Sequence, residues 1–308
     1  MPARASRPTS WTAFTSSSTS RPPLPDDRFA AAASARLGPL AVLHPFPTLL
    51  VAAATGAIAA IAGADLARSV ALALAMAGFQ ASIGALNDIH DRSDDEVAKP
   101  WKPLPAGRVT FAAARATALG GGLLGFLLSA AAGPAALAIG LIGYGLGVAY
   151  DLGLKRTGWG WLAFALALPL VPVYAWVGAA ARLPPDTLVV AVMGPLAGLA
   201  LACANGLVDL ERDAVAGGRG VAVRLGRWRA TAAIVAADIA LVAVAWATST
   251  GERGVTPALV AATVTLAVGA AWSARMAVRW RWLGWQAQAA GVAILAVGWL
   301  AGAARASG

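Results

Sequence analysis

Two acidic clusters of matching spacing interrupt an otherwise apolar chain. The first lies in "NDIHDRSDD", which starts at Asn87, and the second lies in "NGLVDLERD", which starts at Asn205. The clusters are offset by a constant 118 residues, and each follows an apolar run. Their matched positions are Asn87, Asp91 and Asp95 in the first cluster, and Asn205, Asp209 and Asp213 in the second. This agreement predicts an internal repeat of a helical-hairpin unit, with one cluster in each half of the chain.

The spacing places each polar set on one helix face, because residues three, four and seven apart lie on the same side of a helix. Asp88 joins the first face. In contrast, Asp94, Glu96 and Glu211 point elsewhere, and we expect them to be solvated or paired with arginine. Five carboxylates and two carboxamides can therefore face each other across a helical bundle.

The chemistry that this set favours is the binding of a hard divalent cation. Like charges beside an apolar bundle repel one another and resist desolvation, and a bound cation relieves both effects. Ligands that offer only oxygen favour Mg²⁺ over Zn²⁺, and Mg²⁺ tends to bridge carboxylates to phosphate oxygens. The two histidines are His44 and His90, and His90 lies off the predicted face, so a zinc site is not expected. The clusters thus predict a clamp for a diphosphate.

Basic residues follow the first cluster and a later helix end, in "KPWKPLPAGR" and "YDLGLKR". Together with Arg92 inside the first motif, the candidate phosphate ligands are Lys99, Lys102, Arg108, Tyr150, Lys155 and Arg156. Cations beside a carboxylate–metal site can bind the remaining phosphate charge. The alternative is that they are ordinary basic residues of cytosolic loops, and for Arg275, Arg279 and Arg281 this is the better interpretation.

The composition indicates the elements that must position these residues. The chain has 308 residues, 58% hydrophobic and 13% charged, with a mean hydropathy of +0.67, whereas a soluble domain carries about 25% charged residues. We therefore predict an all-α, polytopic membrane protein, a bundle of about nine transmembrane helices with both motifs facing one cytosolic-side cavity. The predicted spans are 39–63, 67–87, 110–131, 133–151, 159–181, 186–207, 228–249, 256–274 and 282–303.

The basic residues predict the orientation of the bundle. With the N-terminus inside, the tail and the even-numbered loops hold 20 of the 24 lysines and arginines, which places them, and both acidic clusters, in the cytosol. We expect residues 1–36, rich in Ser, Pro, Thr and Arg, to be a disordered extension and residues 37–308 to form one transmembrane domain. The arginines are spread over short loops without a basic stripe, so nucleic acid is not an expected partner. The single cysteine, Cys203, excludes an internal disulfide.

These motifs resemble those of the UbiA superfamily of intramembrane prenyltransferases. "NDIHDRSDD" is similar to the family motif NDxxDxxxD, and "DLERD" to the second motif DxxxD. The stretches "KPWKPLPAG" and "YDLGLKR" also look like that family, and the resemblance extends from about residue 37 to the end of the chain. It implies a cell-membrane enzyme that moves an isoprenyl chain from its diphosphate to a lipophilic or aromatic acceptor, with Mg²⁺ as cofactor.

The resemblance also implies roles for particular residues. It assigns metal binding to Asp88, Asp91, Asp95, Asp209 and Asp213, and substrate binding to Asn87, Arg92, Lys102, Tyr150, Lys155 and Asn205. Asp91 and Asp209 are the expected catalytic residues, and Asp91 is a candidate base for the acceptor's proton. The prenyl chain would lie in an apolar chamber open to lipid, with an aromatic wall from Tyr144, Trp159, Trp161, Phe164, Tyr174 and Trp176.

Two departures and two alternatives remain open. Many family members carry an arginine before a proline where this chain has His44, which puts a benzoate-like acceptor in doubt, and Val221 and Ala222 stand where many relatives have threonine. One alternative is a terpene cyclase of the same superfamily, which would act on the diphosphate alone. The other is a transporter or binding protein for cations or phosphorylated lipids, although transporter sites tend to lie near the midplane of the bilayer.

Overall fold

The computed structural model describes residues 27–249 and 256–306, and its regular elements in those ranges are all helices. The all-α prediction is thus confirmed. The helices are α1 (Asp27–Leu37), η1 (Gly38–Leu43), α2 (Pro45–Ile61), α3 (Leu66–His90), α4 (Arg92–Ala98), α5 (Phe111–Ala132), α6 (Pro134–Leu152), η2 (Leu154–Arg156), α7 (Gly160–Ala180), α8 (Thr187–Val208), α9 (Leu210–Val215), α10 (Val221–Thr248), α11 (Thr256–Ser273) and α12 (Val278–Ala306).

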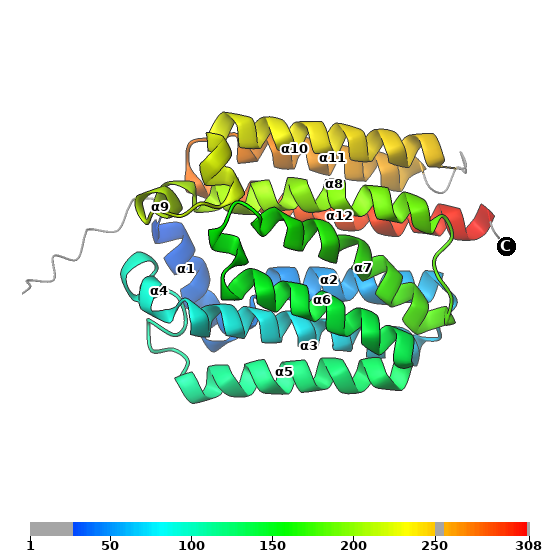
Figure 1. Ribbon diagram of the computed structural model, residues 1–308, viewed down its shortest axis with the longest axis horizontal. Coiled ribbons are helices and arrows are strands. Elements are labelled where there is room, and N and C mark those ends of the chain that lie inside the picture. Colours follow the sequence, from blue (N-terminus) through cyan, green and yellow to red (C-terminus); the bar gives the residue numbers. More distant parts are fainter. Residues whose placement is uncertain (1–26, 250–255, 307–308) are drawn as a thin grey trace, which may run out of the picture.

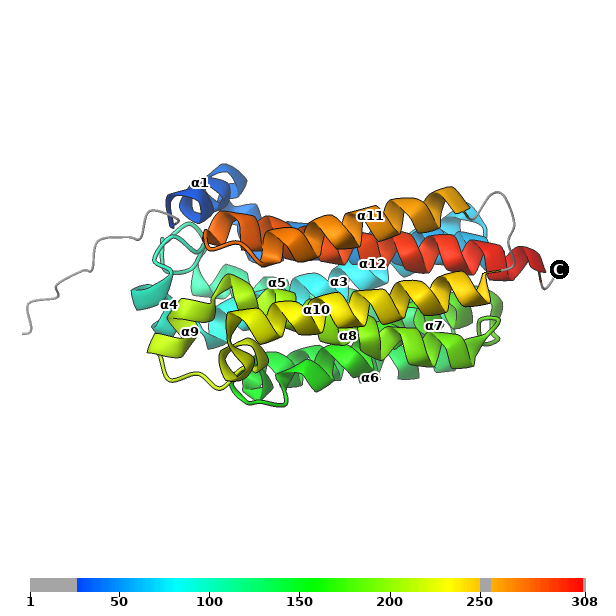
Figure 2. The ribbon, with the colours of Figure 1, turned by 90° about the horizontal axis from the view of Figure 1, so that it is seen from above.

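Nine long helices run side by side along the long axis of the molecule and coincide with the nine predicted spans (Figures 1 and 2). In the described residues, eight of them are individually long and apolar enough to cross a membrane, and a ninth span results if the bent pair Arg28–Leu43 and Pro45–Ile61 is counted as one. The short helices α1, α4 and α9 gather at one end of the bundle, which we call the acidic end because both acidic motifs lie there.

The first predicted span, 39–63, is not one continuous helix. It breaks at His44, which adopts a left-handed conformation (φ 47°, ψ 63°) between η1 and α2, and the two arms bend by 53°. Pro45 explains the break, because proline has no backbone N–H to continue the preceding helix and is well suited to begin a new one. The Thr48 hydroxyl donates to the Leu43 carbonyl across the break, at 2.7 Å.

The predicted N-terminal extension is helical where the structure describes it. Residues 27–37 form α1, so the boundary expected at residue 36 falls inside an ordered element, and residues 1–26 lie outside the described residues. The run "AAAASA" has high helix propensity. Contacts to the rest of the bundle also hold α1 in place: the Phe29 ring packs edge-on against Trp282 at 5.4 Å, and the Ser34 hydroxyl donates to the Trp101 carbonyl.

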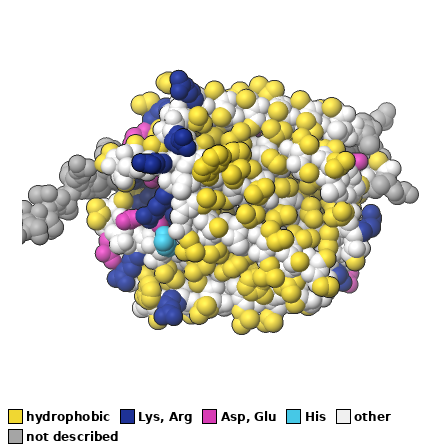
Figure 3. All heavy atoms as spheres, in the orientation of Figure 1, with side chains coloured by type: hydrophobic (Ala, Val, Ile, Leu, Met, Phe, Trp, Pro, Cys, Tyr) yellow, Lys and Arg dark blue, Asp and Glu magenta, His cyan; other side chains and the backbone are white. Residues whose placement is uncertain are grey.

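The surface separates into an apolar belt and a charged end. Hydrophobic side chains cover the sides of the helices, and basic and acidic side chains concentrate around α1, α4 and α9 (Figure 3). Among the described lysines and arginines, only Arg68, Arg182 and Arg305 belong to the opposite end of the bundle. Most of the described basic residues therefore lie at the acidic end of the bundle.

Small residues let α3 and α5 approach closely. A Cβ atom added at Gly121 would lie 2.7 Å from the Gly78 carbonyl oxygen, and one at Gly78 would lie 2.6 Å from the Gly121 carbonyl oxygen. By contrast, a Cβ atom at Gly120 would meet nothing within 4 Å. Close backbone packing of this kind stabilises helix pairs in lipid, where burial of apolar surface from water does not drive association.

We predict that Gly121→Ala destabilises the protein by about 1–3 kcal/mol, because the methyl group must push two backbones apart. The matched variant Gly120→Ala should be neutral or stabilising by up to about 1 kcal/mol, since alanine favours the helix. Thermal unfolding of the detergent-solubilised variants measures both effects. Equal midpoints for the two variants would contradict the close contact between α3 and α5.

Candidate active site

The first motif continues one polar face across the junction of α3 and α4. Asp91 ends α3, and the backbone N–H groups of Asp91 and Asp95 donate to the carbonyls of Asn87 and Asp91, at 2.9 and 2.8 Å. The four-residue hydrogen-bond pattern therefore passes through the junction. Asp88 and Asp95 are both buried, at 1% and 5% exposure.

Lys102 joins the two buried carboxylates of this motif. Its ammonium donates to Asp88 Oδ1 at 2.9 Å and to Asp95 Oδ2 at 2.7 Å, and lies 3.4 Å from the Asn87 amide oxygen. Burial disfavours its charge, but the two carboxylates outweigh that effect and raise the pKa of Lys102 above its ordinary value. His44, at the break between η1 and α2, lies 3.2 Å from Asp88 Oδ1. Asp88 Oδ2 is buried without a hydrogen-bond partner among the described residues.

A second pair of cations reaches the same motif from the loop after α6. Lys155 donates to Asp91 Oδ2 at 2.5 Å, and Arg156 donates to Asp91 Oδ1 at 3.1 Å. Burial opposes ionisation of Asp91, but Lys155 and the other cations lower the pKa of this carboxyl below its ordinary value. The Asn87 amide nitrogen donates to Asp151 Oδ1 at 2.9 Å, so the end of α6 also contacts the first motif.

The second motif spans the junction of α8 and α9. Asp209 accepts from Lys99 at 2.6 Å and from Arg212 at 2.8 Å. Burial works against its charge, yet these cations lower the pKa of Asp209 to about 2. The Asp213 carboxylate makes no hydrogen bond or ion pair with the described residues. Although Asp213 is exposed, desolvation by the surrounding protein and then the negative charge of Asp209 raise the pKa of this carboxyl to about 6.

The two motifs meet at the acidic end of the bundle. Lys99 and Lys102 belong to the same loop, and they bind the second and the first motif respectively. On the other side, Asn205 Nδ2 of α8 lies 3.3 Å from the Tyr150 hydroxyl of α6. Tyr150 itself packs edge-on against the Phe164 ring at 5.1 Å. Apart from Arg92 and Arg108, the residues predicted to bind metal or phosphate thus belong to one connected region. Arg108 instead donates to the Ser34 hydroxyl and the Trp101 carbonyl.

Arg92 lies away from this cluster. Its guanidinium pairs with Glu96 at 3.1 Å, lies 6.0 Å from the centre of the Phe111 ring, and is half exposed. The i,i+4 spacing of Arg92 and Glu96 on α4 accounts for this placement.

Three residues had no predicted role in the site: His44, Asp151 and Glu211. Lys99 was predicted as a phosphate ligand, and the structure pairs it with Asp209 of the second motif. Glu211 is paired as expected, but its partner Arg281 is fully buried and binds both carboxylate oxygens, at 2.9 and 2.6 Å. Arg281 therefore fastens α9 to α12, contrary to its interpretation as an ordinary basic residue of a loop.

The oxygen ligands of this region suit a hard divalent cation, although in the present structure lysine side chains pair with most of the motif carboxylates. Among the described side chains, no three of the types His, Cys, Asp and Glu converge as a metal-ligand group, since cations bind most of the carboxylates. The set nevertheless offers oxygen ligands almost exclusively, and Asp88 Oδ2 retains free lone pairs. A divalent cation would meet the same charges that the ammonium groups of Lys99, Lys102 and Lys155 now neutralise.

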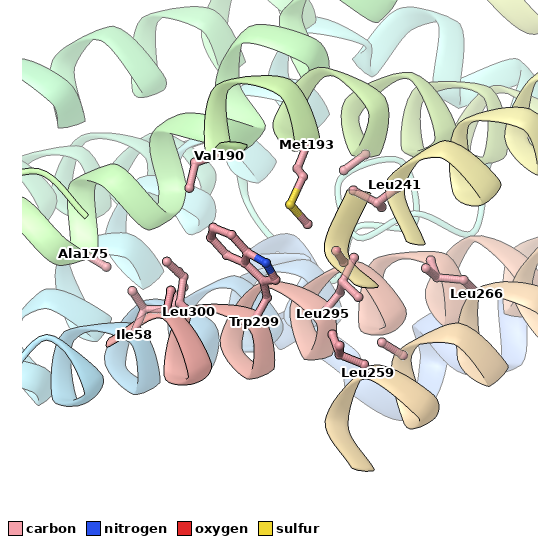
Figure 4. Packing of buried hydrophobic residues seen from close by; sticks show 14 of the residues in the cluster. Ile58, Ala175, Val190, Met193, Leu241, Leu259, Leu266, Leu295, Trp299 and Leu300 are labelled. Atoms are coloured by element: carbon pink, nitrogen blue, oxygen red, sulfur yellow. The ribbon is translucent and has the colours of Figure 1, made fainter. Parts of the chain in front are cut away.

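A wholly apolar cavity, which we call the aliphatic cavity, lies deeper in the bundle between α2, α7, α8, α10 and α12. Together with its opening to the surface, it contains about 840 Å³ of space. Met193 of α8 and Trp299 of α12 point toward each other within the surrounding cluster (Figure 4). The Trp299 indole N–H donates to the Thr248 hydroxyl at 2.9 Å, which fixes the ring. The cavity extends along α8 from Val190 to Leu201, one helical turn from Asn205.

The aromatic residues expected to line one chamber are dispersed. Tyr144 and Tyr174 line a second cavity between α3, α6 and α7, whereas Phe164 packs on Tyr150. Trp176 is fully buried in the main hydrophobic cluster, and Trp159 is 60% exposed. Trp161 lines neither cavity. Helical direction explains the dispersion, because neighbouring positions on α7 face different partners.

Comparison with known proteins identifies relatives of this fold. A family model described as the UbiA prenyltransferase family matches residues 46–297. A digeranylgeranylglyceryl phosphate synthase from Ignicoccus hospitalis is 34% identical over 196 residues, covering 59% of this chain and 64% of the relative. A chloroplastic chlorophyll synthase from Avena sativa is 31% identical over 196 residues, covering 58% of this chain and 51% of the relative. The chain thus spans less than two thirds of either relative.

Solved structures show the same fold at lower sequence identity. An apo UbiA homologue from Aeropyrum pernix K1 superposes with a TM-score of 0.65 at 21% identity, over 84% of this chain and 97% of the other. A UbiA homologue from Archaeoglobus fulgidus bound to GPP and Mg²⁺ superposes with a TM-score of 0.62 at 18% identity, over 84% and 99%.

The family model covers most of the chain, and the spans it includes are the long apolar helices described above. The chain is therefore a multi-pass membrane protein that belongs to the UbiA prenyltransferase family.

Proposed function

We propose that this chain is a magnesium-dependent membrane enzyme that transfers an isoprenyl chain from its diphosphate to a lipophilic or aromatic acceptor. One observation carries the proposal: two Asn/Asp motifs meet three lysines at one end of a bundle, a helical turn away from a wholly apolar cavity. A substrate with a strongly anionic head and a hydrocarbon tail fits such a combination. The names of the two enzyme relatives, and the homologue bound to GPP and Mg²⁺, support it.

The proposed metal ligands are the carboxylates of both motifs. They are Asp88, Asp91, Asp95, Asp209 and Asp213, and the amides of Asn87 and Asn205 add neutral oxygens. Bound Mg²⁺ would neutralise the charge that develops on the departing diphosphate. Glu211, held by the buried Arg281, fixes the helix that carries Asp213.

Lysine side chains would bind the diphosphate oxygens. Lys102 and Lys155 now neutralise motif carboxylates, and each can turn its ammonium toward phosphate when a cation takes its place. The Tyr150 hydroxyl can donate to the same group. Arg92 must leave Glu96 and Phe111 before it can contribute.

The transfer step breaks the bond between C1 of the prenyl group and the bridging oxygen, and the electron pair leaves with the diphosphate. An electron pair of the acceptor then forms the new bond to C1. The acceptor loses a proton, for which Asp91 is the proposed base, and Asp209 supplies negative charge opposite it. The apolar bundle excludes water, which would otherwise capture the allylic cation.

The aliphatic cavity is the proposed site of the prenyl chain. Its length along α8, from Val190 to Leu201, is about 16 Å at the rise of an α-helix. An isoprene unit has four chain bonds, slightly more than an extended residue, so the cavity accommodates about three to four units. The charge distribution supports an orientation in which the N-terminus and the acidic end face the cytoplasm.

Asp91→Asn and Asp209→Asn should each reduce transfer by at least about 100-fold, because each removes a charge that the transition state requires. The assay measures pyrophosphate release and prenylated lipid in proteoliposomes, with geranylgeranyl diphosphate, Mg²⁺ and lipid extract as the acceptor source. EDTA should abolish the activity of the wild-type protein, and added Mg²⁺ should restore it.

The matched control is Asp186→Asn, which removes an exposed carboxylate at the opposite end of the bundle and should leave the rate unchanged. Wild-type rates in both aspartate variants would overturn the proposed roles. A prenyl product formed without any acceptor would favour the cyclase, and substrate flux without pyrophosphate release would favour a transporter.

Filling the aliphatic cavity should shorten the chain that the enzyme accepts. Ala293→Phe places a ring into the cavity, and should lower transfer from geranylgeranyl diphosphate about tenfold relative to transfer from dimethylallyl diphosphate. Ile294→Phe, on the adjacent outward-facing position, should not change this ratio. If both variants left the ratio at its wild-type value, the prenyl chain would have to bind elsewhere.

A further inference from the structure

We propose that the second cavity, between α3, α6 and α7, binds a ring-bearing lipophile with a carbonyl or hydroxyl group, and that this ligand is the acceptor. The inference rests on the proposed function, which requires a second substrate. We call this cavity the Gln80 pocket. Together with its opening to the surface, it contains about 410 Å³ of space, and the only lining residue that it shares with the aliphatic cavity is Val171.

The walls of the Gln80 pocket are fixed in place by two buried hydrogen-bond chains. The Tyr144 hydroxyl lies 2.9 Å from the Ser82 hydroxyl, which donates to the Ala118 carbonyl at 2.6 Å. The Tyr174 hydroxyl lies 2.8 Å from the Ser129 hydroxyl, which donates to the carbonyl of Gly125 at 2.6 Å. Each serine hydroxyl donates its only proton to a backbone carbonyl, so in each pair the tyrosine hydroxyl is the donor and the serine oxygen is the acceptor. Neither tyrosine hydroxyl has a proton left for a ligand.

Gln80 is the remaining polar side chain of the lining, and its carboxamide makes no hydrogen bond with any described residue. It lies within the membrane-spanning helix α3, seven residues before Asn87 and so about 10 Å deeper in the bundle. An unpaired amide at such a depth is unfavourable and usually marks a functional position. Because a carboxamide both donates and accepts, it can pair with a carbonyl or a hydroxyl group.

The aromatic content of the Gln80 pocket favours a ring rather than a flexible chain. Phe79 and Tyr144 line it, and both contact Phe126 in edge-to-face geometry, with ring centres 5.1 and 5.2 Å apart. Aromatic side chains bind further rings in offset or edge-on arrangements. The aliphatic cavity offers no comparable polar group among its lining residues. A hydrocarbon chain therefore fits that cavity, and a ring with an oxygen substituent fits the Gln80 pocket.

The geometry also leads from the Gln80 pocket to the reacting centre. Ile83 lines the pocket about one helical turn before Asn87. Tyr144 lies on α6 six residues, or about 9 Å, before Tyr150. A ring held by Gln80 would thus lie below the Asn87–Tyr150 region. Its opposite edge would point toward the proposed position of the diphosphate.

The test compares two probes of the same skeleton, menadione and methylnaphthalene, which differ in the carbonyl groups. The measurement is the shift in thermal unfolding that each probe causes in detergent-solubilised protein, converted to affinity by linkage. We expect wild-type protein to prefer menadione. In Gln80→Leu, menadione should bind about fivefold more weakly, the value of one net hydrogen bond, while methylnaphthalene binds at least as well as before. Gln286→Leu is the matched control, since Gln286 lines neither cavity.

A second pair of variants tests whether the probes bind in the Gln80 pocket, and leaves the Gln80 carboxamide unchanged. A Cβ atom at Gly143 would meet only Leu170, at 4.0 Å, so Gly143→Leu can fill the Gln80 pocket without a backbone clash. It should weaken both probes, whereas Gly145→Leu, which faces open space on the same helix, should weaken neither.

Unchanged menadione preference in Gln80→Leu, or unchanged binding of both probes in Gly143→Leu, would overturn the inference. Loss of geranylgeranyl diphosphate binding in Gly143→Leu would also overturn it, because the prenyl chain would then occupy the Gln80 pocket. Asp91→Asn should keep wild-type probe binding, so failure of the proposed transfer reaction and failure of this inference give different results.

Discussion

The structure depends on the neutralisation of carboxylates that lie at the edge of a very apolar bundle. Asp88 and Asp95 are almost completely buried, and Asp91 and Asp209 are each bound by two cations. Without those cations the carboxylates would be charged, desolvated and close to one another, which is strongly unfavourable. The fold satisfies this requirement with lysines from two loops, one after the first motif and one after α6.

The neutralisation of the carboxylates by lysine has a functional meaning because a divalent cation can replace the ammonium groups. A buried ammonium and a divalent cation both neutralise the carboxylates, but only the divalent cation can also bind phosphate oxygens as ligands. In the proposed enzyme, metal and diphosphate would enter together and release lysines that then bind phosphate. The aliphatic cavity would bind the prenyl chain, and the Gln80 pocket would bind the more polar ring of the acceptor. Binding of an anionic head, an apolar chain and an oxygen-bearing ring would thus occur in three distinct environments.

Much of this arrangement could be predicted from the sequence. Runs of about twenty apolar residues gave the nine long helices, and the repeated Asn/Asp spacing gave the two motifs, since both signals are local and periodic. The break at His44 was missed because an apolar run does not reveal a kink, although Pro45 carried the relevant signal. The packing of α1 depends on a contact between Phe29 and Trp282, which are distant in sequence.

In the site, too, local spacing could be predicted from the sequence, whereas contacts between distant residues could not. Residues of the two motifs came from spacing, whereas their partners depended on three-dimensional neighbours: Lys99 crosses to Asp209, and Arg281 reaches Glu211 seventy residues away. The Arg92 guanidinium could pair either with the site or with the nearby Glu96, and in the structure it pairs with Glu96. The motif alone does not show which partner it takes. Gln80 and the serine–tyrosine pairs carried no sequence signal, because their meaning lies in the hydrogen bonds that each does or does not form.

In the proposed enzyme, both motifs bind one diphosphate as a unit. The most direct measurement is a double-mutant cycle on Mg²⁺-dependent binding of geranylgeranyl diphosphate, using Asp91→Asn, Asp209→Asn and the double variant. If the motifs bind the diphosphate together, coupling between the two substitutions is strong, and the double variant binds scarcely more weakly than either single variant. Losses that simply add, or a binding site that survives intact without Asp209, would contradict it.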